Sequence, residues 1–142
     1  MYVIKETVPD RLALTGLYDA VGWSPYTAEP DRLLAAVGRS SYLRTAWHDG
    51  QLVGLCRALS DGFIVCYLLD LLVHPDHQRR GLGKRLLQTC LDDHADVRQL
   101  LLMTDDRPEQ LALYRSAGLK SLRALEVHPL NVFLRIQGVD LR

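Results

Sequence analysis

Two closely spaced glycines in a basic segment give this sequence its clearest chemical signal. The segment consists of Gln78, Arg79, Arg80, Gly81, Leu82, Gly83 and Lys84. Glycine lets the backbone approach a ligand closely, and the free N–H groups at the start of a helix attract phosphate. We therefore expect these residues to bind a phosphate or pyrophosphate. The alternative is a tight turn with a solvated basic rim.

The segment differs from the two common nucleotide-binding loops. A Walker loop has more glycine and ends in Gly-Lys-Ser/Thr. The dinucleotide fingerprint has three glycines directly after the first strand of its fold. The sequence matches neither pattern, so a different kind of phosphate site is expected.

Asp70 is a second residue whose surroundings point to chemistry. It is the single charge in the otherwise apolar run 63–73, and a carboxylate in such a run is costly unless it is paired, hydrated or functional. A carboxylate can take a proton from a reacting amine. Asp70 is therefore a candidate general base, and the alternative is a structural ion pair, for example with Arg57.

The elements that must position these residues follow from the hydrophobic pattern and the turn signals. The expected strands are 2–6, 42–48, 51–59, 63–73, 99–103, 119–127 and 132–136. The expected helices are 9–20, 30–38, 84–94 and 108–117. This order predicts a mixed α/β fold with helices on both faces of one sheet, formed by a single domain over residues 1–142.

The run from Leu71 to Lys84 resembles the central motif of the Gcn5-related N-acetyltransferase (GNAT) family. That motif reads Gln/Arg-x-x-Gly-x-Gly/Ala after a strand that ends in Val-x-Pro, and the sequence fits it without a gap. The family's second signature lies near the end of the last helix, here Ala112 to Leu119. The order of elements also agrees, up to about residue 123.

The resemblance implies a fold and a cofactor. The fold is a central, mostly antiparallel sheet with helices on both faces and splayed central strands. The cofactor is acetyl-coenzyme A, whose pyrophosphate accepts hydrogen bonds from the backbone of Gln78 to Gly83. Its pantetheine arm pairs with Leu71, Leu72 and Val73 like an added strand, and a bulge commonly opens the sheet for it.

The resemblance also assigns roles to single residues. Tyr114 matches the tyrosine that protonates the leaving thiolate, although a packed aromatic is the alternative. Asp70 lies on the strand that faces the acceptor, and the Leu72 N–H is expected to stabilise the oxyanion. Asp106 stands where many relatives have an asparagine that binds the pantetheine arm, and its carboxylate cannot donate that bond. Leu119 replaces the usual phenylalanine.

Trp23 and Tyr26 lie between the two N-terminal helices, where relatives line the acceptor cleft. We expect both to contact the substrate, and the alternative is an apolar plug over the core.

Composition narrows the class of protein. The 142 residues include 17 basic and 17 acidic side chains, and this balance argues against a nucleic-acid partner. No apolar run reaches the ~20 residues of a membrane helix. Cys56, Cys66 and Cys90 lack metal-ligand or redox spacing, so we expect buried free thiols in a reducing compartment. His74 and His77 have no third ligand, so no metal is expected.

These observations predict an N-acetyltransferase that passes the acetyl group of acetyl-coenzyme A directly to a primary amine of a small molecule or protein. The N-terminus lacks signal-peptide features, which places the protein in the cytoplasm. The alternative function is a non-catalytic acyl-coenzyme A sensor or interaction module. Homodimer formation through edge strands near the C-terminus is left open, and the sequence does not identify the acceptor.

Overall fold

A computed structural model describes all 142 residues. The chain divides into two compact units, Met1–Thr104 and Asp105–Arg142, and each is described by itself. None of the helices is long and apolar enough to cross a membrane.

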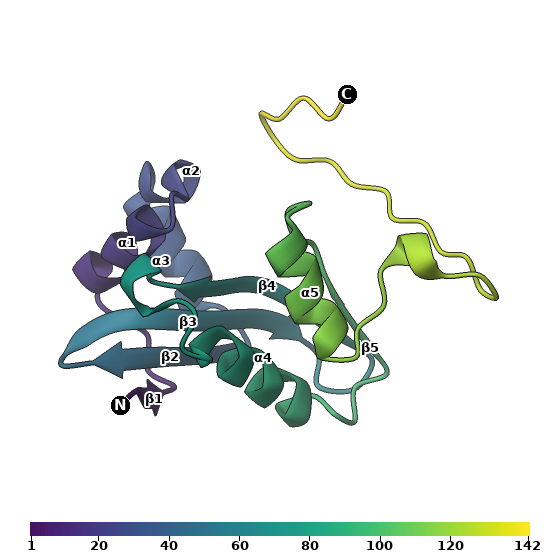
Figure 1. The fold of residues 1–142 in the computed structure, drawn as a ribbon. Coiled ribbons are helices and arrows are strands. Elements are labelled where there is room, and N and C mark those ends of the chain that lie inside the picture. Colours follow the sequence, from purple (N-terminus) through teal and green to yellow (C-terminus); the bar gives the residue numbers. More distant parts are fainter. The chain divides into compact units, whose positions relative to one another are not determined.

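The first unit contains the whole sheet (Figure 1). Its strands are β1 (Val3–Lys5), β2 (Tyr42–His48), β3 (Gln51–Ser60), β4 (Val65–Val73) and β5 (Gln99–Leu102). They lie in the order β1-β2-β3-β4-β5. Strands β1 to β4 are antiparallel, and β5 runs parallel to β4. The expected mixed, mostly antiparallel sheet is therefore confirmed.

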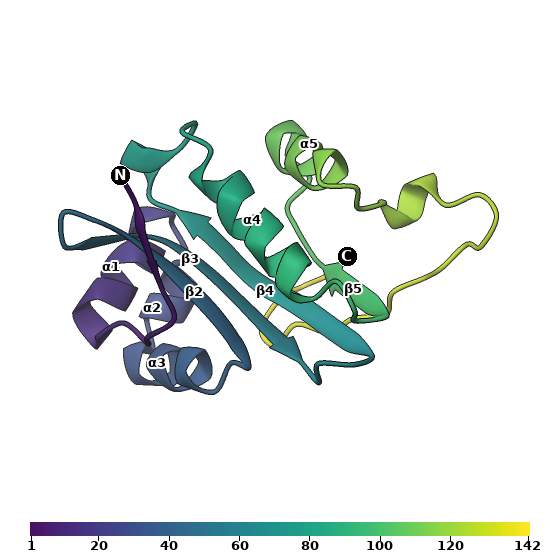
Figure 2. The same ribbon diagram turned by 90° about the horizontal axis from the view of Figure 1, so that it is seen from below.

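Helices cover both faces of this sheet, as Figure 2 shows. One face carries α1 (Arg11–Ala20), α2 (Ser24–Thr27) and α3 (Pro30–Gly38), and the other carries α4 (Leu82–Asp93). The Asp10 carboxylate caps α1 by accepting the Ala13 N–H at 2.8 Å, as an N-cap residue does. The sequence pattern missed α2, because Pro25 looks like a breaker but lies in the first turn, where no hydrogen bond is lost.

The apolar faces of the helices pack on the sheet from opposite sides. Leu14 and Leu17 of α1 belong to one buried cluster with Leu55 and Leu72 of the sheet. On the other side, Gly54 of β3 leaves room for Leu86 of α4, because a Cβ at Gly54 would lie 3.1 Å from the Leu86 Cδ1. The two layers hold the central strands in a fixed register.

The second unit contains α5 (Pro108–Ser116) and a short 3₁₀ helix at Leu122–Ala124. The prediction of two closing strands at 119–127 and 132–136 is wrong, since neither range contains a strand. The apolar side chains there have no partner strand, and Val127 and Phe133 are 82% and 96% exposed. Strand propensity reflects packing on a pleated surface, so an apolar pattern without such a surface does not form a strand.

Candidate functional site

The register between β3 and β4 slips by one residue inside the sheet. Arg57 lies opposite Asp70, whereas the next residue, Ala58, lies opposite Leu68. Leu69 is therefore an extra residue on β4, which forms a β-bulge. The bulge lies at the position where the family resemblance led us to expect the sheet to open.

The bulge also reverses the alternation of side chains along β4. Cys66 precedes it and groups with Cys90 of α4. Asp70 follows it and contacts Tyr18 of α1 on the opposite face. In a regular strand Cys66 and Asp70, four positions apart, would point to the same side, because successive side chains alternate; the bulge places them on opposite sides.

Strand β5 covers only the first part of β4. Its four residues pair with Val65 to Leu68, and Figure 2 shows how short β5 is beside its neighbour. The rest of β4, Leu69 to Val73, has β3 on one side and no strand on the other. This free stretch is an edge to which an extended ligand can add by main-chain hydrogen bonds.

The pairing pattern shows which backbone groups of β4 face that free side. His74 donates its N–H to the Val53 carbonyl at 2.8 Å, so these two residues form a hydrogen-bonded pair. Such pairs alternate along an antiparallel ladder. Leu72 therefore directs its N–H and carbonyl at β3, and Leu71 and Val73 direct theirs at the free side.

The loop after β4 is fixed to the end of that strand. The Gln78 side-chain amide donates to the Val73 carbonyl at 3.1 Å. Arg79 and Gly81 have φ angles of 62° and 80°, the left-handed region that glycine tolerates best. Turns of this kind direct successive N–H groups to one side and form concave anion sites. Helix α4 then begins at Leu82, so its free N–H groups adjoin the turn.

Gly83 has no evident role in the packing of the chain. A Cβ at this position would meet only the Val73 Cγ2, at an ordinary contact distance of 3.5 Å. Alanine is more favourable than glycine inside a helix, by about 1 kcal/mol. A glycine here therefore fits the close approach of a ligand better than it fits the needs of the fold.

Positive charge surrounds the loop. The side chains of Arg79, Arg80, Lys84 and Arg85 are exposed, and they add to the partial positive charge at the start of α4. The pKa of His77 is lowered, first by desolvation and then by the charge of Arg80. The loop therefore favours a negatively charged ligand.

Asp70 is buried and paired on the α1 face. Its Oδ2 accepts the Tyr18 hydroxyl and the Arg57 Nε–H, both at 2.6 Å. Burial and the Asp70 charge raise the pKa of Tyr18. Burial alone would lower the pKa of Arg57, but the charge and hydrogen bond of Asp70 outweigh it and raise that pKa. The structure thus contains the Arg57 ion pair named as the alternative role of Asp70.

Two expected site residues belong to the second unit. Tyr114 lies on α5 and is partly buried. Asp106 precedes α5 and is exposed, with its Oδ1 3.9 Å from the Arg123 Nη1. The catalytic role of Tyr114 and the pantetheine contact of Asp106 stay predictions.

Trp23 and Tyr26 form an aromatic group with Tyr18. The ring centroids of Trp23 and Tyr26 are 5.8 and 6.1 Å from that of Tyr18. Trp23 packs against the apolar core, whereas Tyr26 is half exposed. Trp23 thus packs as the apolar plug would, and Tyr26 keeps an exposed surface. Contact of either residue with the substrate stays a prediction.

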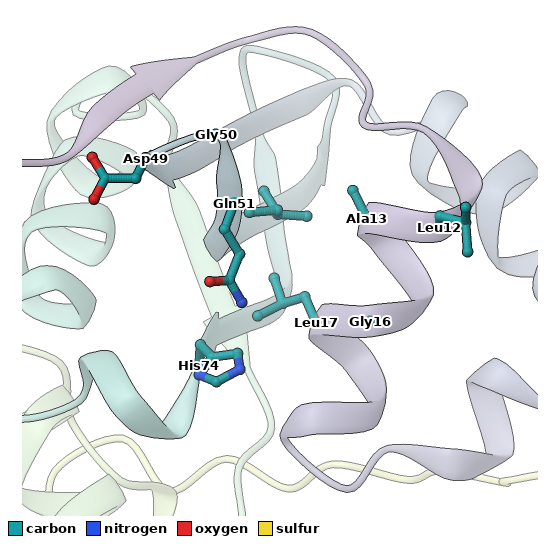
Figure 3. A pocket seen from close by; sticks show the side chains of 9 residues that line it. Leu12, Ala13, Gly16, Leu17, Asp49, Gly50, Gln51 and His74 are labelled. Atoms are coloured by element: carbon teal, nitrogen blue, oxygen red, sulfur yellow. The ribbon is translucent and has the colours of Figure 1, made fainter.

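A pocket of about 480 Å³ lies on the α1 side of the sheet. Figure 3 shows Gln51, Leu17 and His74 around it, beside the turn that joins β2 and β3. His74 is four positions after Asp70, which is about 13 Å along a strand. The pocket contains none of the expected site residues and lies away from the bulge.

Sequence reasoning missed Leu69 and the role of Tyr18. A bulge has no local sequence signature here, because Leu69 is one apolar residue among several. The spacing of Tyr18 indicates only the apolar face of its helix, and its hydroxyl meets Asp70 only through the tertiary fold. The charge of Asp70 in an apolar run was the one available sign that a polar partner such as Tyr18 lies nearby.

The bulged fourth strand, its partly free edge and the basic glycine loop define a protein with the acetyltransferase (GNAT) fold. The chain belongs to the acetyltransferase (GNAT) family, whose model matches residues 10–119.

Comparison with known proteins gives relatives that are named as acetyltransferases. An uncharacterized N-acetyltransferase, ycf52-like, from Prochlorococcus marinus is 31% identical over 116 residues, 77% of this chain and 62% of the relative. Histone acetyltransferase TAP1 from Glycine max is 29% identical over 126 residues, 79% of this chain and 52% of that protein. The chain thus spans between half and two thirds of these relatives.

A solved structure covers more of the chain. A GNAT family acetyltransferase from Streptococcus pneumoniae TIGR4 is 29% identical, with a TM-score of 0.77, and the match covers 96% of this chain and all of that one.

Proposed function

We propose that residues 1–142 form one acetyltransferase domain that passes an acetyl group from acetyl-coenzyme A directly to a primary amine of a small molecule or protein. One observation carries this proposal. The free stretch of β4, Leu69 to Val73, leads through His74 to the basic glycine loop. A single extended ligand with a pyrophosphate at one end matches that arrangement.

Backbone groups do most of the cofactor binding in this proposal. Leu71 pairs with the pantetheine arm through its N–H and carbonyl, and Val73 through its N–H, because these groups face the free side of β4. The N–H groups from Gln78 to Gly83 receive the pyrophosphate, and the side chains of Arg79, Arg80 and Lys84 add charge. Gln78 holds the loop in place through the Val73 carbonyl.

The thioester reaction needs a donor for the oxyanion and a neutral amine. We assign the oxyanion contact to the N–H of Leu71, since the Leu72 N–H is directed at β3. A lysine-like amine has a pKa of about 10.4, so it must lose a proton before it attacks. Asp70 is the candidate base, directly or through water, and it must act while it is paired with Arg57.

Collapse of the tetrahedral intermediate releases the coenzyme A thiolate. A thiol pKa of about 8.5 makes this leaving group tolerable without help. We propose that Tyr114 protonates it and so accelerates this step. Tyr26, which presents a half-exposed ring, contacts the acceptor, with Trp23 fixing its position.

The non-catalytic sensor is retained as the second candidate function. Asp70 favours it, because its carboxylate is buried and its Oδ2 already accepts hydrogen bonds from Tyr18 and Arg57. Thiol release over a panel of amines separates the two functions. Release with any amine supports the enzyme, and cofactor binding without release on any amine supports the sensor.

Substitution of Gly83 by alanine tests the cofactor site. The Gly83→Ala variant should unfold at the same or a higher temperature, because alanine favours the helix and the added Cβ meets only Val73. Its affinity for acetyl-coenzyme A should fall at least tenfold, which calorimetry measures. The matched control is Gly38→Ala at the end of α3, where a Cβ also has free space, and it should bind normally.

Either of two results would reject the cofactor site. The first is a Gly83→Ala variant that binds the cofactor as the unaltered protein does. The second is the absence of any heat when folded protein is titrated with acetyl-coenzyme A and with coenzyme A.

A further inference from the structure

All three cysteines of the chain meet in the layer between the sheet and α4. Cys56 comes from β3, Cys66 from β4 and Cys90 from α4, and all three are fully buried. His94 follows directly after α4. The ligand atoms of Cys66, Cys90 and His94 lie within 4.8 Å of one another. The proposed acetyl transfer uses none of these groups.

The Cys90 sulfur is the centre of this thiol cluster, which consists of Cys56, Cys66, Cys90 and His94. Hydrogen bonds from Cys56, then the charge and hydrogen bond of His94 and a bond from Cys66, lower the pKa of Cys90. The pKa of Cys56 is raised by its bond to Cys90 and by burial, and burial raises that of Cys66 to about 11.

The imidazole of His94 is already close to this sulfur. Its Nδ1 lies 3.7 Å from the Cys90 Sγ and 2.7 Å from the Cys90 carbonyl oxygen. The short distance to a carbonyl places a proton on Nδ1, which donates to that oxygen. The Tyr42 ring packs against the imidazole at 4.7 Å between centroids, and the Tyr42 hydroxyl donates to Asp93. These contacts cover the cluster near the end of the helix.

The spacing suits a four-coordinate soft cation. Bond lengths of about 2.3 Å to sulfur and 2.0 Å to nitrogen place neighbouring ligand atoms of a tetrahedral zinc site roughly 3.5 to 3.8 Å apart. The 3.7 Å between Cys90 Sγ and His94 Nδ1 lies in that range. The other separations among Cys66, Cys90 and His94, up to 4.8 Å, need a contraction of roughly 1 Å, to the ligand spacing of a zinc site. Cys56 lies outside this group of three, so its side chain has to rotate toward them to become the fourth ligand.

We propose that the thiol cluster is a structural binding site for one Zn²⁺ or a similar thiophilic cation, with Cys66, Cys90, His94 and Cys56 as its four ligands. Three cysteines and one histidine are a frequent donor set of structural zinc sites. Binding releases the thiol protons to solvent, and His94 loses the Nδ1 proton or moves it to Nε2. The four ligands leave no open position for a substrate.

The site would join three elements that are distant in sequence. Because its ligands are fully or partly buried, the cation enters as the chain folds or when the last turn of α4 opens. Metal bound only by the folded state stabilises that state. The inference does not depend on acetyl transfer, so its test does not involve activity.

The test refolds the full chain with and without Cd²⁺, which reports thiolate ligation through its ultraviolet charge-transfer band, and repeats the refolding with Zn²⁺. We expect one equivalent of either metal per chain and a higher unfolding temperature than for the metal-free protein. His94→Asn should weaken the affinity at least tenfold. The matched control His128→Asn, an exposed residue of the second unit, should bind normally.

Cys66→Ser removes a ligand outright and should lose the cadmium band. If Cys66→Ser fails to fold, His94→Asn serves as the test of metal binding. The His94 side chain is only partly buried, so its replacement is expected to leave the fold intact. The proposal is overturned if the unaltered chain refolded with Cd²⁺ shows no band. It is also overturned if His94→Asn and His128→Asn bind the metal with equal affinity.

Discussion

The Asp70→Asn substitution separates the structural role of this residue from its catalytic one. The change keeps the shape of the side chain and removes its charge. Asp70 and Arg57 have side chains that are 4% and 10% exposed, and their atoms are 2.6 Å apart. The substitution therefore leaves a guanidinium largely buried without its counterion.

The expected cost follows from this burial. Removing one partner of a buried ion pair costs about 3 to 5 kcal/mol, because the other charge stays desolvated. The free energy of unfolding of a domain is typically about 5 to 15 kcal/mol. The Asp70→Asn variant should therefore stay folded but lose a large part of this free energy. The unfolding temperature should fall by roughly 10 to 20 °C, at about 3 to 4 °C per kcal/mol for a chain of this size.

A double-mutant cycle measures the pairing itself. Denaturant unfolding is compared for Asp70→Asn, Arg57→Met and the double variant. The double variant should be more stable than the sum of the single changes predicts, by about 2 to 3 kcal/mol. The control is Asp93→Asn, whose partner Arg44 is 20% exposed while Asp93 is 41% exposed, and it should cost under about 1 kcal/mol.

Turnover of the folded variant then decides the catalytic role. A general base contributes roughly 100-fold or more, so a loss of that size with Asp70→Asn supports the base. A change of only a few-fold assigns Asp70 to structure alone. Additive effects of the two single substitutions on stability, or a loss below about 1 kcal/mol for Asp70→Asn, would refute the ion-pair argument.

Three further predictions follow from named contacts. Tyr114→Phe should keep the fold and lower kcat by about tenfold or more; unchanged turnover at saturating substrate rejects the acid role. Gly54→Ala should lower the free energy of unfolding by about 1 to 3 kcal/mol, because the new Cβ would lie 3.1 Å from two packed side chains. Denaturant unfolding measures this loss, and a variant as stable as the unaltered chain contradicts the prediction. The Asp61 carboxylate accepts hydrogen bonds from three backbone N–H groups, and these bonds lower its pKa. The stability that the ionised carboxylate adds is fully present above the ordinary aspartate pKa of about 3.9. It is lost as the pH falls through the lower pKa of the folded state. The stability difference from Asp61→Ala should therefore shrink in acid, and a pH-independent difference counts against the turn contacts.

The sequence predicted those parts of the fold that depend on local pattern. The strand at Tyr42–His48 and the helix at Pro30–Gly38 have the expected bounds, because each combines a clear period with a turn or proline signal. The glycine loop also follows a buried strand and begins a helix as expected. The predicted strands at 119–127 and 132–136 failed because a strand also needs a partner.

Features that depend on long-range pairing were beyond the sequence. The slip at Leu69 is a property of the register between two strands, and no residue type marks it. The direction of the Leu72 N–H follows from the same register. The convergence of Cys56 with Cys66 and Cys90 comes from three elements, so their spacing along the chain gave no sign of it.

The extra residue in β4 makes the site sensitive to chain length more than to side-chain identity. Any apolar residue at position 69 keeps the number of residues in β4 and hence the bulge, so substitutions there should be tolerated. Deletion of Leu69 would leave Asp70 opposite Arg57 and Leu68 opposite Ala58, so the later side chains would keep their faces, but the bulge beside the free edge of β4 would be lost. Natural variation at this point of the chain should therefore exchange residues freely while insertions and deletions stay absent.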